Sequence, residues 1–439
     1  MKKQIAFVFA VLCAGAVLAT PATIPEDSVS VTQNLSHRMF VNYTLENGPA
    51  IVTFELLTNG VSIGDAPIAN AEGDVFKKVG SGEHSFMWNA NKGWPGHCFP
   101  KGGDVTVSVR VIAWDVNCAP NVMVIDLMTP SNVMYYASLE GLPRGIQDKV
   151  YKTDKLVLRK IPAEYVVWKM GSPSSESGYN RWNETQLQVT LTKDYYLGVY
   201  EVTQKQWYNI KGTKPAYFNN PDCWETRPVE QVGYSTDAAE NIRGSASWPN
   251  GEDPHKVAET SFFGKLRTHS GLDLLDFPTE AQWEYACRAG VPGVYYTGLP
   301  YDAANAEKIA RYAGDGGCID GTTAPDRGCS TDNGTAEVGS YEPNTWGLYD
   351  MLGNVSEWVL DIWKGNLGTD PVVDPVGNQP QSGNQLNTLR GGSWKDRLQV
   401  IRCGSRSRYL ITDPYQSDSM ATLWNKEVYG GFRVCLHLQ

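Results

Sequence analysis

The sequence has little charge and few histidines. Charged residues make up 20% of the 439 residues. The six histidines are scattered, and no two have the spacing of metal ligands, which argues against a histidine-based metal centre. Acidic residues outnumber basic ones to give a net charge of −10, and no dense Lys/Arg run interrupts this balance. Nucleic acid and anionic membrane are therefore not expected as partners.

Other common functional signatures are also missing. There is no internal repeat, no low-complexity tract and no Gly-rich phosphate loop before a helix. Ser393 lies in an Arg-Gly-Gly-Ser-Trp run that lacks the elbow pattern of a nucleophilic serine, and no histidine lies nearby. No apolar run after residue 18 is long enough to cross a bilayer, so no transmembrane segment is expected.

The N-terminus has the pattern of an export signal. Lys2 and Lys3 precede an apolar run from Ile5 to Leu18, and Ala19 offers a small residue for cleavage. Residues 1–19 are therefore predicted to be a signal peptide. The mature protein is expected to be exported to a periplasmic, cell-surface or extracellular location.

Export changes what the cysteines are expected to do. Eight cysteines follow the signal, and an oxidising compartment favours their pairing. Spacing suggests Cys98–Cys118 and Cys318–Cys329 as local disulfides, with Cys287–Cys435 as a longer one. Cys223 and Cys403 are left without an assigned partner.

Residues 24–120 read as a small β domain. Strands are expected at 40–45, 51–56 and 82–89, and residues 104–111 alternate strictly between apolar and polar side chains. A Trp-Asn turn followed by a Gly/Pro loop and this alternating strand resembles the end of a bacterial immunoglobulin-like repeat. Such a sandwich is usually a spacer or docking module. Residues 121–154 are expected to be a linker.

From residue 155 the pattern changes to short strands mixed with helices. Residues 156–162 and 189–203 are expected to form short strands joined by a turn, and Thr203 and Thr279 each have the position of a helix N-cap. Within this region, residues 346–358 combine large apolar side chains with Asp350 and Glu357, which flank a Gly353-Asn354 turn. The stretch is either a buried aromatic corner with two surface acids or a loop that folds around a cation.

Six motifs in this region occur in an order that can be compared with known families. They are Met170-Gly171-Ser172, Tyr200-Glu201-Val202-Thr203, Pro278 to Ala286, Gly347 to Trp358, Arg390 to Trp394 and Gly431-Phe432-Arg433. Together they closely resemble the formylglycine-generating enzyme, or sulfatase-modifying factor, family over residues 155–439. The resemblance implies an α+β, C-type-lectin-like fold for these residues, preceded by the all-β immunoglobulin-like sandwich.

The resemblance also implies an activity and a cofactor. Active members oxidise a cysteine of sulfatase precursors to formylglycine, using O₂ and Cu⁺ held by two cysteines five residues apart. Arg402-Cys403 resembles the segment around the second cysteine, but Leu398 stands five residues earlier and cannot ligate copper. Cys403 is therefore a buried small hydrophobe, a disulfide partner or a lone catalytic thiol.

The family's Ca²⁺ loop matches this chain more closely. By resemblance, its ligands are Asp350, Gly353, Val355 and Glu357, and two acids with carbonyl oxygens suit a hard cation. The competing interpretation is that Asp350 caps a turn and Glu357 pairs with an arginine.

A binding groove is the remaining candidate site. Arg402, Arg406 and Arg408 have the spacing of one strand face and, with Ser393 and Trp394, are predicted to line a groove for anions or peptide backbone. Pairing with the chain's many carboxylates explains the arginines equally well.

Three functions are compatible with these observations. The first is a divergent family member that binds an unknown protein, peptide or glycan and no longer oxidises. The second is an active oxidase for sulfatase precursors with Cys403 as its thiol. The third is a structural surface or adhesion module. Leu398 favours the first.

Overall fold

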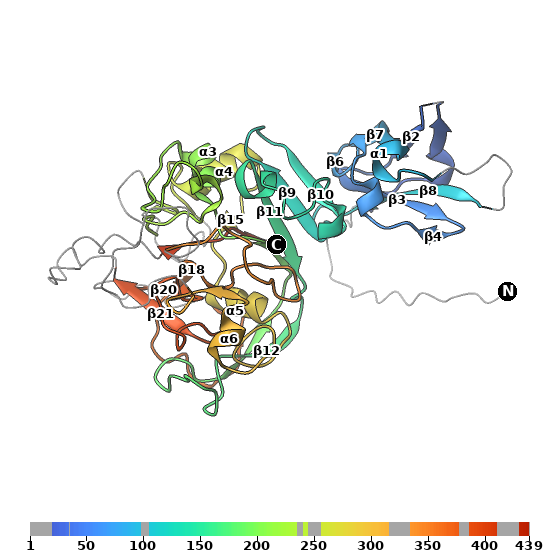
Figure 1. The fold of residues 1–439 in the computed structure, drawn as a ribbon. Coiled ribbons are helices and arrows are strands. Elements are labelled where there is room, and N and C mark those ends of the chain that lie inside the picture. The colour runs from blue at the N-terminus through green and yellow to red at the C-terminus, as the bar shows by residue number, and fades with distance from the viewer. Residues whose placement is uncertain are drawn as a thin grey trace.

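The structure is a computed structural model that describes residues 20–34, 36–97, 105–234, 240–244, 256–315, 334–376, 386–410 and 430–438. The N-terminal unit is built from two antiparallel sheets (Figure 1). One has the order β1-β2-β7-β5, and the other has the order β4-β3-β6 with β8 paired to β3. The strands are β1 Ser30–Gln33, β2 Arg38–Leu45, β3 Ala50–Thr58, β4 Val61–Ser62, β5 Glu72–Gly73, β6 Lys77–Val79, β7 Gly82–Asn89 and β8 Val107–Trp114.

Side-chain alternation explains how these two sheets share a core. Val41, Tyr43 and Leu45 on β2 are buried, while their neighbours along the strand face outward or lie half-buried. Phe54 of β3 packs on Phe86 of β7 with ring centroids 4.7 Å apart, which joins the two sheets. The predicted strands at 40–45, 51–56 and 82–89 are confirmed, and the alternating strand begins three residues later than predicted. The short helix α1 (Ala90–Gly93) follows β7.

Residues 121–154 form part of a sheet, so the prediction of a linker was wrong. β9 (Val122–Asp126) and β10 (Val133–Tyr136) are the first two strands of a six-stranded sheet, and α2 (Val150–Thr153) precedes β11. The same residues contact the N-terminal unit: the Tyr135 amide donates to the Phe76 carbonyl at 2.7 Å, and Ser138 Oγ donates to Asp65 at 2.5 Å. Residues 121–154 therefore hydrogen-bond both to the N-terminal unit and within the six-stranded sheet, which a free linker would not do.

The larger C-terminal unit contains short sheets joined by long ordered loops (Figure 1). The six-stranded sheet has the order β10-β9-β11-β14-β23-β15, and a four-stranded sheet has the order β21-β20-β18-β22. A three-stranded sheet β12-β13-β19 and the pair β16-β17 complete the set within the described residues. The remaining strands are β11 Lys155–Ile161, β12 Val166–Met170, β13 Leu187–Leu191, β14 Tyr195–Gly198, β15 Leu275–Asp276, β16 Ala310–Arg311, β17 Leu352–Gly353, β18 Ser356–Ile362, β19 Val372–Val373, β20 Leu386–Arg390, β21 Arg406–Leu410, β22 Gly430–Gly431 and β23 Cys435–His437.

Two helices begin where the sequence predicts. Thr203 caps α3 (Gln204–Lys211) and Thr279 caps α5 (Glu280–Arg288), each through a capping box. The other helices are α4 (Phe262–Ser270) and α6 (Ala303–Ala306). α5 matters most for the site because almost all of it is buried. Its sequence therefore places acids and a cysteine in the interior as well as apolar side chains.

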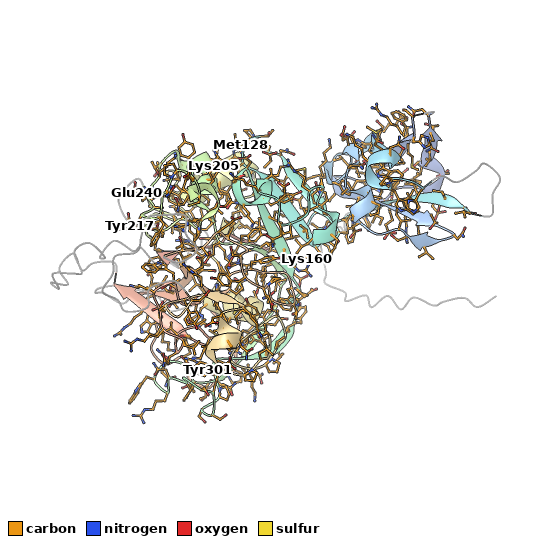
Figure 2. All side chains as sticks on the ribbon, viewed as in Figure 1. Met128, Lys160, Lys205, Tyr217, Glu240 and Tyr301 are labelled. Atoms are coloured by element: carbon orange, nitrogen blue, oxygen red, sulfur yellow. The ribbon has the colours of Figure 1, made fainter. Side chains whose placement is uncertain are left out.

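Side chains fill the space between the sheets of the C-terminal unit, whereas Met128, which is 62% exposed, lies at its margin (Figure 2). No helix among the described residues is long and apolar enough to cross a membrane.

Candidate functional site

The turn in the 346–358 stretch has an unusual backbone. Asp350 and Asn354 have positive φ values of 54° and 58°, and Gly353 lies between them at 77°. Asn and Asp tolerate this left-handed region better than other residues that carry a Cβ. A Cβ at Gly353 would lie 2.2 Å from the Arg311 carbonyl oxygen, so only glycine fits. The residue types at positions 350, 353 and 354 therefore determine the backbone conformation of this turn.

Glu201 binds this turn through both oxygens of its carboxylate. It follows β14 and is fully buried. Its Oε2 accepts from Asn354 Nδ2 at 2.6 Å, and its Oε1 accepts from the Val355 amide at 3.0 Å. Sequence reasoning used Glu201 only as part of a family motif and missed this role. An acid inside the apolar run of residues 195–202 was the available signal.

Glu357 is bound by an arginine. Arg433 Nε donates to Glu357 Oε2 at 2.7 Å, and its Nη2 donates to Oε1 at 2.6 Å. Trp283 Nε1 also donates to Glu357 Oε2 at 2.7 Å. All three side chains are buried. The alternative interpretation of Glu357, pairing with an arginine, therefore describes this structure.

Asp350 is in a different state. Its Oδ2 accepts from the Gly339 amide at 2.6 Å, whereas Oδ1 is buried and has no hydrogen-bond partner among the described residues. Burial raises the pKa of Asp350 to about 6. Burial also raises the pKa of Glu201 well above its usual range, with the charges of Asp350 and Glu357 adding to the effect. Three buried carboxyl groups thus lie around one arginine, Arg433, and the raised pKa values show that Asp350 and Glu201 favour their neutral forms.

These observations test the predicted Ca²⁺ ligands one by one. The free Oδ1 of Asp350 fits a hard cation, and so does the surplus of buried carboxyl groups over arginines at the turn. Glu357 fits less well because Arg433 and Trp283 already occupy both of its oxygens. Gly353 and Val355 would contribute only backbone carbonyls. No group of three or more His, Cys, Asp or Glu side chains that could hold a metal is found in the part of the chain that the structure describes.

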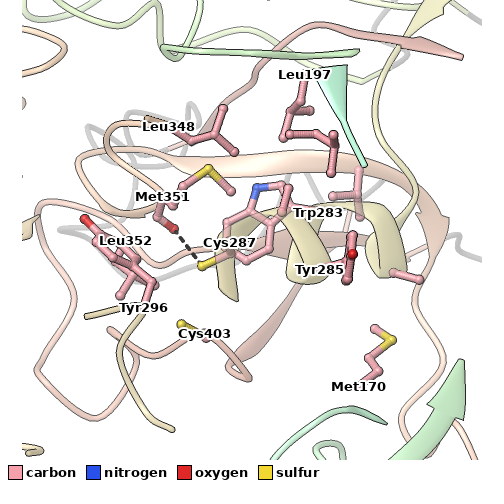
Figure 3. Close-up of a cluster of buried hydrophobic side chains, with 14 of the residues drawn as sticks. Met170, Leu197, Trp283, Tyr285, Cys287, Tyr296, Leu348, Met351, Leu352 and Cys403 are labelled. Carbon is pink, nitrogen blue, oxygen red and sulfur yellow. Dashed lines mark hydrogen bonds between the residues drawn. The ribbon is translucent and has the colours of Figure 1, made fainter. Parts of the chain in front are cut away.

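Cys403 lies in the hydrophobic core and not in a cleft. It is fully buried, its amide donates to the Val294 carbonyl, and its carbonyl accepts from Arg390 Nη2. Cys287 of α5 is also fully buried and neighbours it (Figure 3). Burial, together with the adjacent Cys403, raises the pKa of the Cys287 thiol well above its usual range. Leu398 packs against the same core cluster.

Two of the three predicted disulfides are wrong. Cys118, Cys287 and Cys435 are free thiols, so Cys98–Cys118 and Cys287–Cys435 are wrong. Cys287 instead neighbours Cys403, because α5 and the 402–405 turn meet in the core. The Cys318–Cys329 pairing and Cys98 itself lie outside the described residues. Cys223 is disulfide-bonded, and its partner lies outside the described part of the chain.

The predicted groove is also wrong, because its arginines are buried in ion pairs. Arg402 Nη2 lies 2.7 Å from Glu184 Oε1, and Arg402 Nη1 lies 2.9 Å from Glu176 Oε1. Arg406 donates to both oxygens of Glu280. Carboxylates from distant segments satisfy these cations, which the spacing along one strand could not reveal.

The other three groove residues do not form a groove either. Trp394 is buried against Phe218, and Ser393 Oγ donates to Asp396 at 2.6 Å. Arg408 is exposed.

The similarity of this chain to known proteins shows its family. The sulfatase-modifying factor enzyme 1-like domain model matches residues 158–416, which is more than half of the chain. The mouse formylglycine-generating enzyme is 34% identical and the match covers 57% of this chain and 70% of the relative. The chain therefore belongs to the formylglycine-generating enzyme family, and its C-terminal unit has that family's fold.

Other relatives carry different names. The chaperone protein LppX of Paenibacillus barcinonensis is 32% identical, over 50% of this chain and 74% of its own length. The serine/threonine-protein kinase pkn1 of Chlamydia pneumoniae is 33% identical, over 56% of this chain and 36% of its own. The solved structure of PvdO from Pseudomonas aeruginosa aligns with 64% of this chain and 94% of its own at 23% identity and a TM-score of 0.43.

Removing the charge of Glu357 is expected to destabilise the fold strongly. Glu357→Gln leaves Arg433 buried without its counter-ion, and breaking a buried pair in this way costs about 3–5 kcal/mol. Glu225→Gln is the matched control, because Glu225 is 34% exposed and its partner Lys149 is 64% exposed. An exposed partner of this kind is worth less than about 1 kcal/mol. Urea unfolding of both variants measures the difference, and equal losses would contradict the account.

The Asp350→Asn variant separates a cation site from a buried surplus acid. If a divalent cation binds, chelation lowers the melting temperature of the wild type but not of the variant. A cation present at one hundred times its Kd adds about 2.7 kcal/mol to the free energy of unfolding. Without a cation, the raised pKa of Asp350 means that stability falls as the pH rises from the ordinary value of 3.8 to about 6, and remains lower above that pH. The variant would then melt higher than the wild type, and chelation would change neither protein. We expect the first pattern in thermal melts with and without chelator.

Proposed function

We propose that this protein is an exported, divergent member of the family that does not oxidise cysteine and acts as a binding module for a protein, peptide or glycan. The observation that carries the proposal is the position of Cys403. It is fully buried in an apolar core, and the position five residues earlier is the apolar Leu398. A substrate cysteine could not reach such a thiol without opening the core.

The residues present do not fit a catalytic copper centre. Cys287 and Cys403 are soft ligands of the kind that Cu⁺ prefers. However, a thiol must lose its proton to bind a metal, and burial raises the pKa of Cys287 well above its usual range. Both sulfurs are also closed off from any substrate by the surrounding core. We therefore derive no oxidation step through copper.

The names of the relatives are compatible with a role other than oxidation. One relative is named a chaperone and another a protein kinase, besides the enzymes that generate formylglycine. The domain is thus found in proteins that are named for unrelated activities. Its scaffold can serve a binding role once the thiol pair is lost.

Export and a structural cation complete the proposal. The signal-like N-terminus supports export, and the disulfide at Cys223 is typical of an oxidising compartment. The N-terminal unit would then be an immunoglobulin-like spacer that carries the larger unit. Ca²⁺ would be held by Asp350 Oδ1 with the carbonyls of Gly353 and Val355, where it would neutralise buried negative charge and lock the turn.

The main alternative is an active oxidase that converts a sulfatase cysteine to formylglycine through Cys403. Family membership supports it, because the mouse relative is a formylglycine-generating enzyme. A structural surface or adhesion module is a further alternative that the N-terminal β unit supports.

Copper binding and peptide oxidation decide between the first two functions. The purified protein is titrated with Cu⁺ against a competing chelator, and then incubated in air with a cysteine-containing sulfatase peptide that is followed by mass spectrometry. We expect no tight copper binding and no conversion of the peptide. Conversion by the wild type that is lost in Cys403→Ser would establish the oxidase and reject the proposal. An active formylglycine-generating enzyme is the positive control for the peptide.

A further inference from the structure

A preformed pocket of about 450 Å³ lies between two segments of the C-terminal unit, beside β12 and the C-terminal end of α5. One wall is the loop at residues 171–186, and the other is the turn at residues 290–293. We call it the loop pocket. Its volume lies within the range of about 300–1,000 Å³ that is common for small-ligand sites.

Buried charges fix the walls of the loop pocket. Arg288 joins them, because its Nη1 donates to the Gly293 carbonyl at 2.9 Å and its Nη2 donates to the Gly171 carbonyl at 3.0 Å. Arg402 holds the loop from behind by pairing with Glu176 and Glu184. A pocket with walls fixed in this way pays little ordering cost when a ligand binds.

Aromatic rings form part of the lining. The ring centroids of Trp168 and Tyr285 lie 5.4 Å apart, and Trp346 packs on Tyr285 edge-on at 5.2 Å. Trp168 and Tyr285 both line the pocket. Such rings present flat apolar faces to a ligand.

Two polar atoms of the lining residues lack partners. Trp168 Nε1 is a buried donor and Glu176 Oε2 is a buried acceptor, and neither has a hydrogen-bond partner in the described part of the chain. Leaving a buried polar atom unpaired costs about 1–3 kcal/mol. A ligand that supplies an acceptor to the first and a donor to the second recovers this cost.

The two unpaired atoms restrict the class of ligand. A purely apolar group would leave both unsatisfied, and a proline carbonyl could satisfy only the Trp168 donor. A cation gains little, because Glu176 is already paired with Arg402 and Arg288 carries positive charge into the same pocket. A sugar ring has flat C–H faces for the aromatic side chains, and its hydroxyls both donate and accept.

We propose that the loop pocket binds a pyranose ring of a glycan, with the rings of Trp168 and Tyr285 as apolar walls, the Trp168 indole N–H as a donor to one hydroxyl and Glu176 as the acceptor. The proposal rests on the proposed binding function and names its ligand class. Gln186, which lines the same pocket, adds a further donor and acceptor for ring hydroxyls.

The test uses the full mature chain on a printed glycan array, followed by calorimetric titration with the methyl glycosides of glucose, galactose, mannose and N-acetylglucosamine. We expect binding on the array and to at least one methyl glycoside. Trp168→Ala should abolish this binding. Trp168→Phe keeps a ring but loses the N–H, so it should weaken binding about two- to tenfold, the value of one hydrogen bond.

Trp182→Ala is the matched control, because Trp182 lies in the same loop but is 70% exposed and is not part of the pocket lining. It should bind as the wild type does. Melting temperatures establish that each variant is folded, and the Phe variant decides the question if Trp168→Ala does not fold.

The proposal is overturned if the folded wild type binds no glycan and no methyl glycoside, or if a polyproline peptide binds the pocket in their place. It is also overturned if Trp182→Ala removes binding while Trp168→Ala does not. The copper and peptide assays are run on the same preparation. A negative result there together with no glycan binding rejects only the sugar assignment. Peptide oxidation would reject the proposed function itself.

Discussion

The buried pair between Arg433 and Glu357 is the interaction on which the centre of the C-terminal unit depends. One guanidinium contacts three segments: Glu357 on β18, the Gly198 carbonyl at the end of β14 and the Tyr349 carbonyl just before the turn at residues 350–354. Removing either side chain would leave the other as an unpaired charge in the core, so the fold requires both. This requirement does not involve the cysteines, so the ion pair can hold the fold whatever residue stands at position 398.

The same principle organises the rest of the interior. α5 brings Glu280 and Glu284 into the core, where Arg406 and Arg390 neutralise them. Arg402 in turn fixes the loop that forms one wall of the loop pocket. Buried charge thus positions loops in a unit with little regular secondary structure. The cost of desolvating these ions is offset only while each keeps its partner.

The sequence was informative where the physics is local. Thr203 and Thr279 cap helices as predicted, since a cap depends on a few neighbouring residues. The six ordered motifs identified the family, and the left-handed turn follows from Gly353 and Asn354. The errors concern pairings between distant segments. The spacing of the arginines predicted that their side chains share one face of a strand. It could not show that the carboxylates of Glu176 and Glu280 form ion pairs with them in the interior. The Cys98–Cys118 and Cys287–Cys435 pairings failed for the same reason, because loop length does not reveal which thiols meet in the core.

The central claim is that Cys403 belongs to the core and not to an active centre. Alkylation of the native protein, with mass spectrometry to assign each modified cysteine, tests this most directly. The exposed Cys118 provides an internal positive control. The account predicts that Cys118 reacts in the native state and that Cys403 reacts only after denaturation, and after reduction if it has become oxidised. Rapid modification of Cys403 in the folded protein, at a rate comparable to that of Cys118, would contradict it.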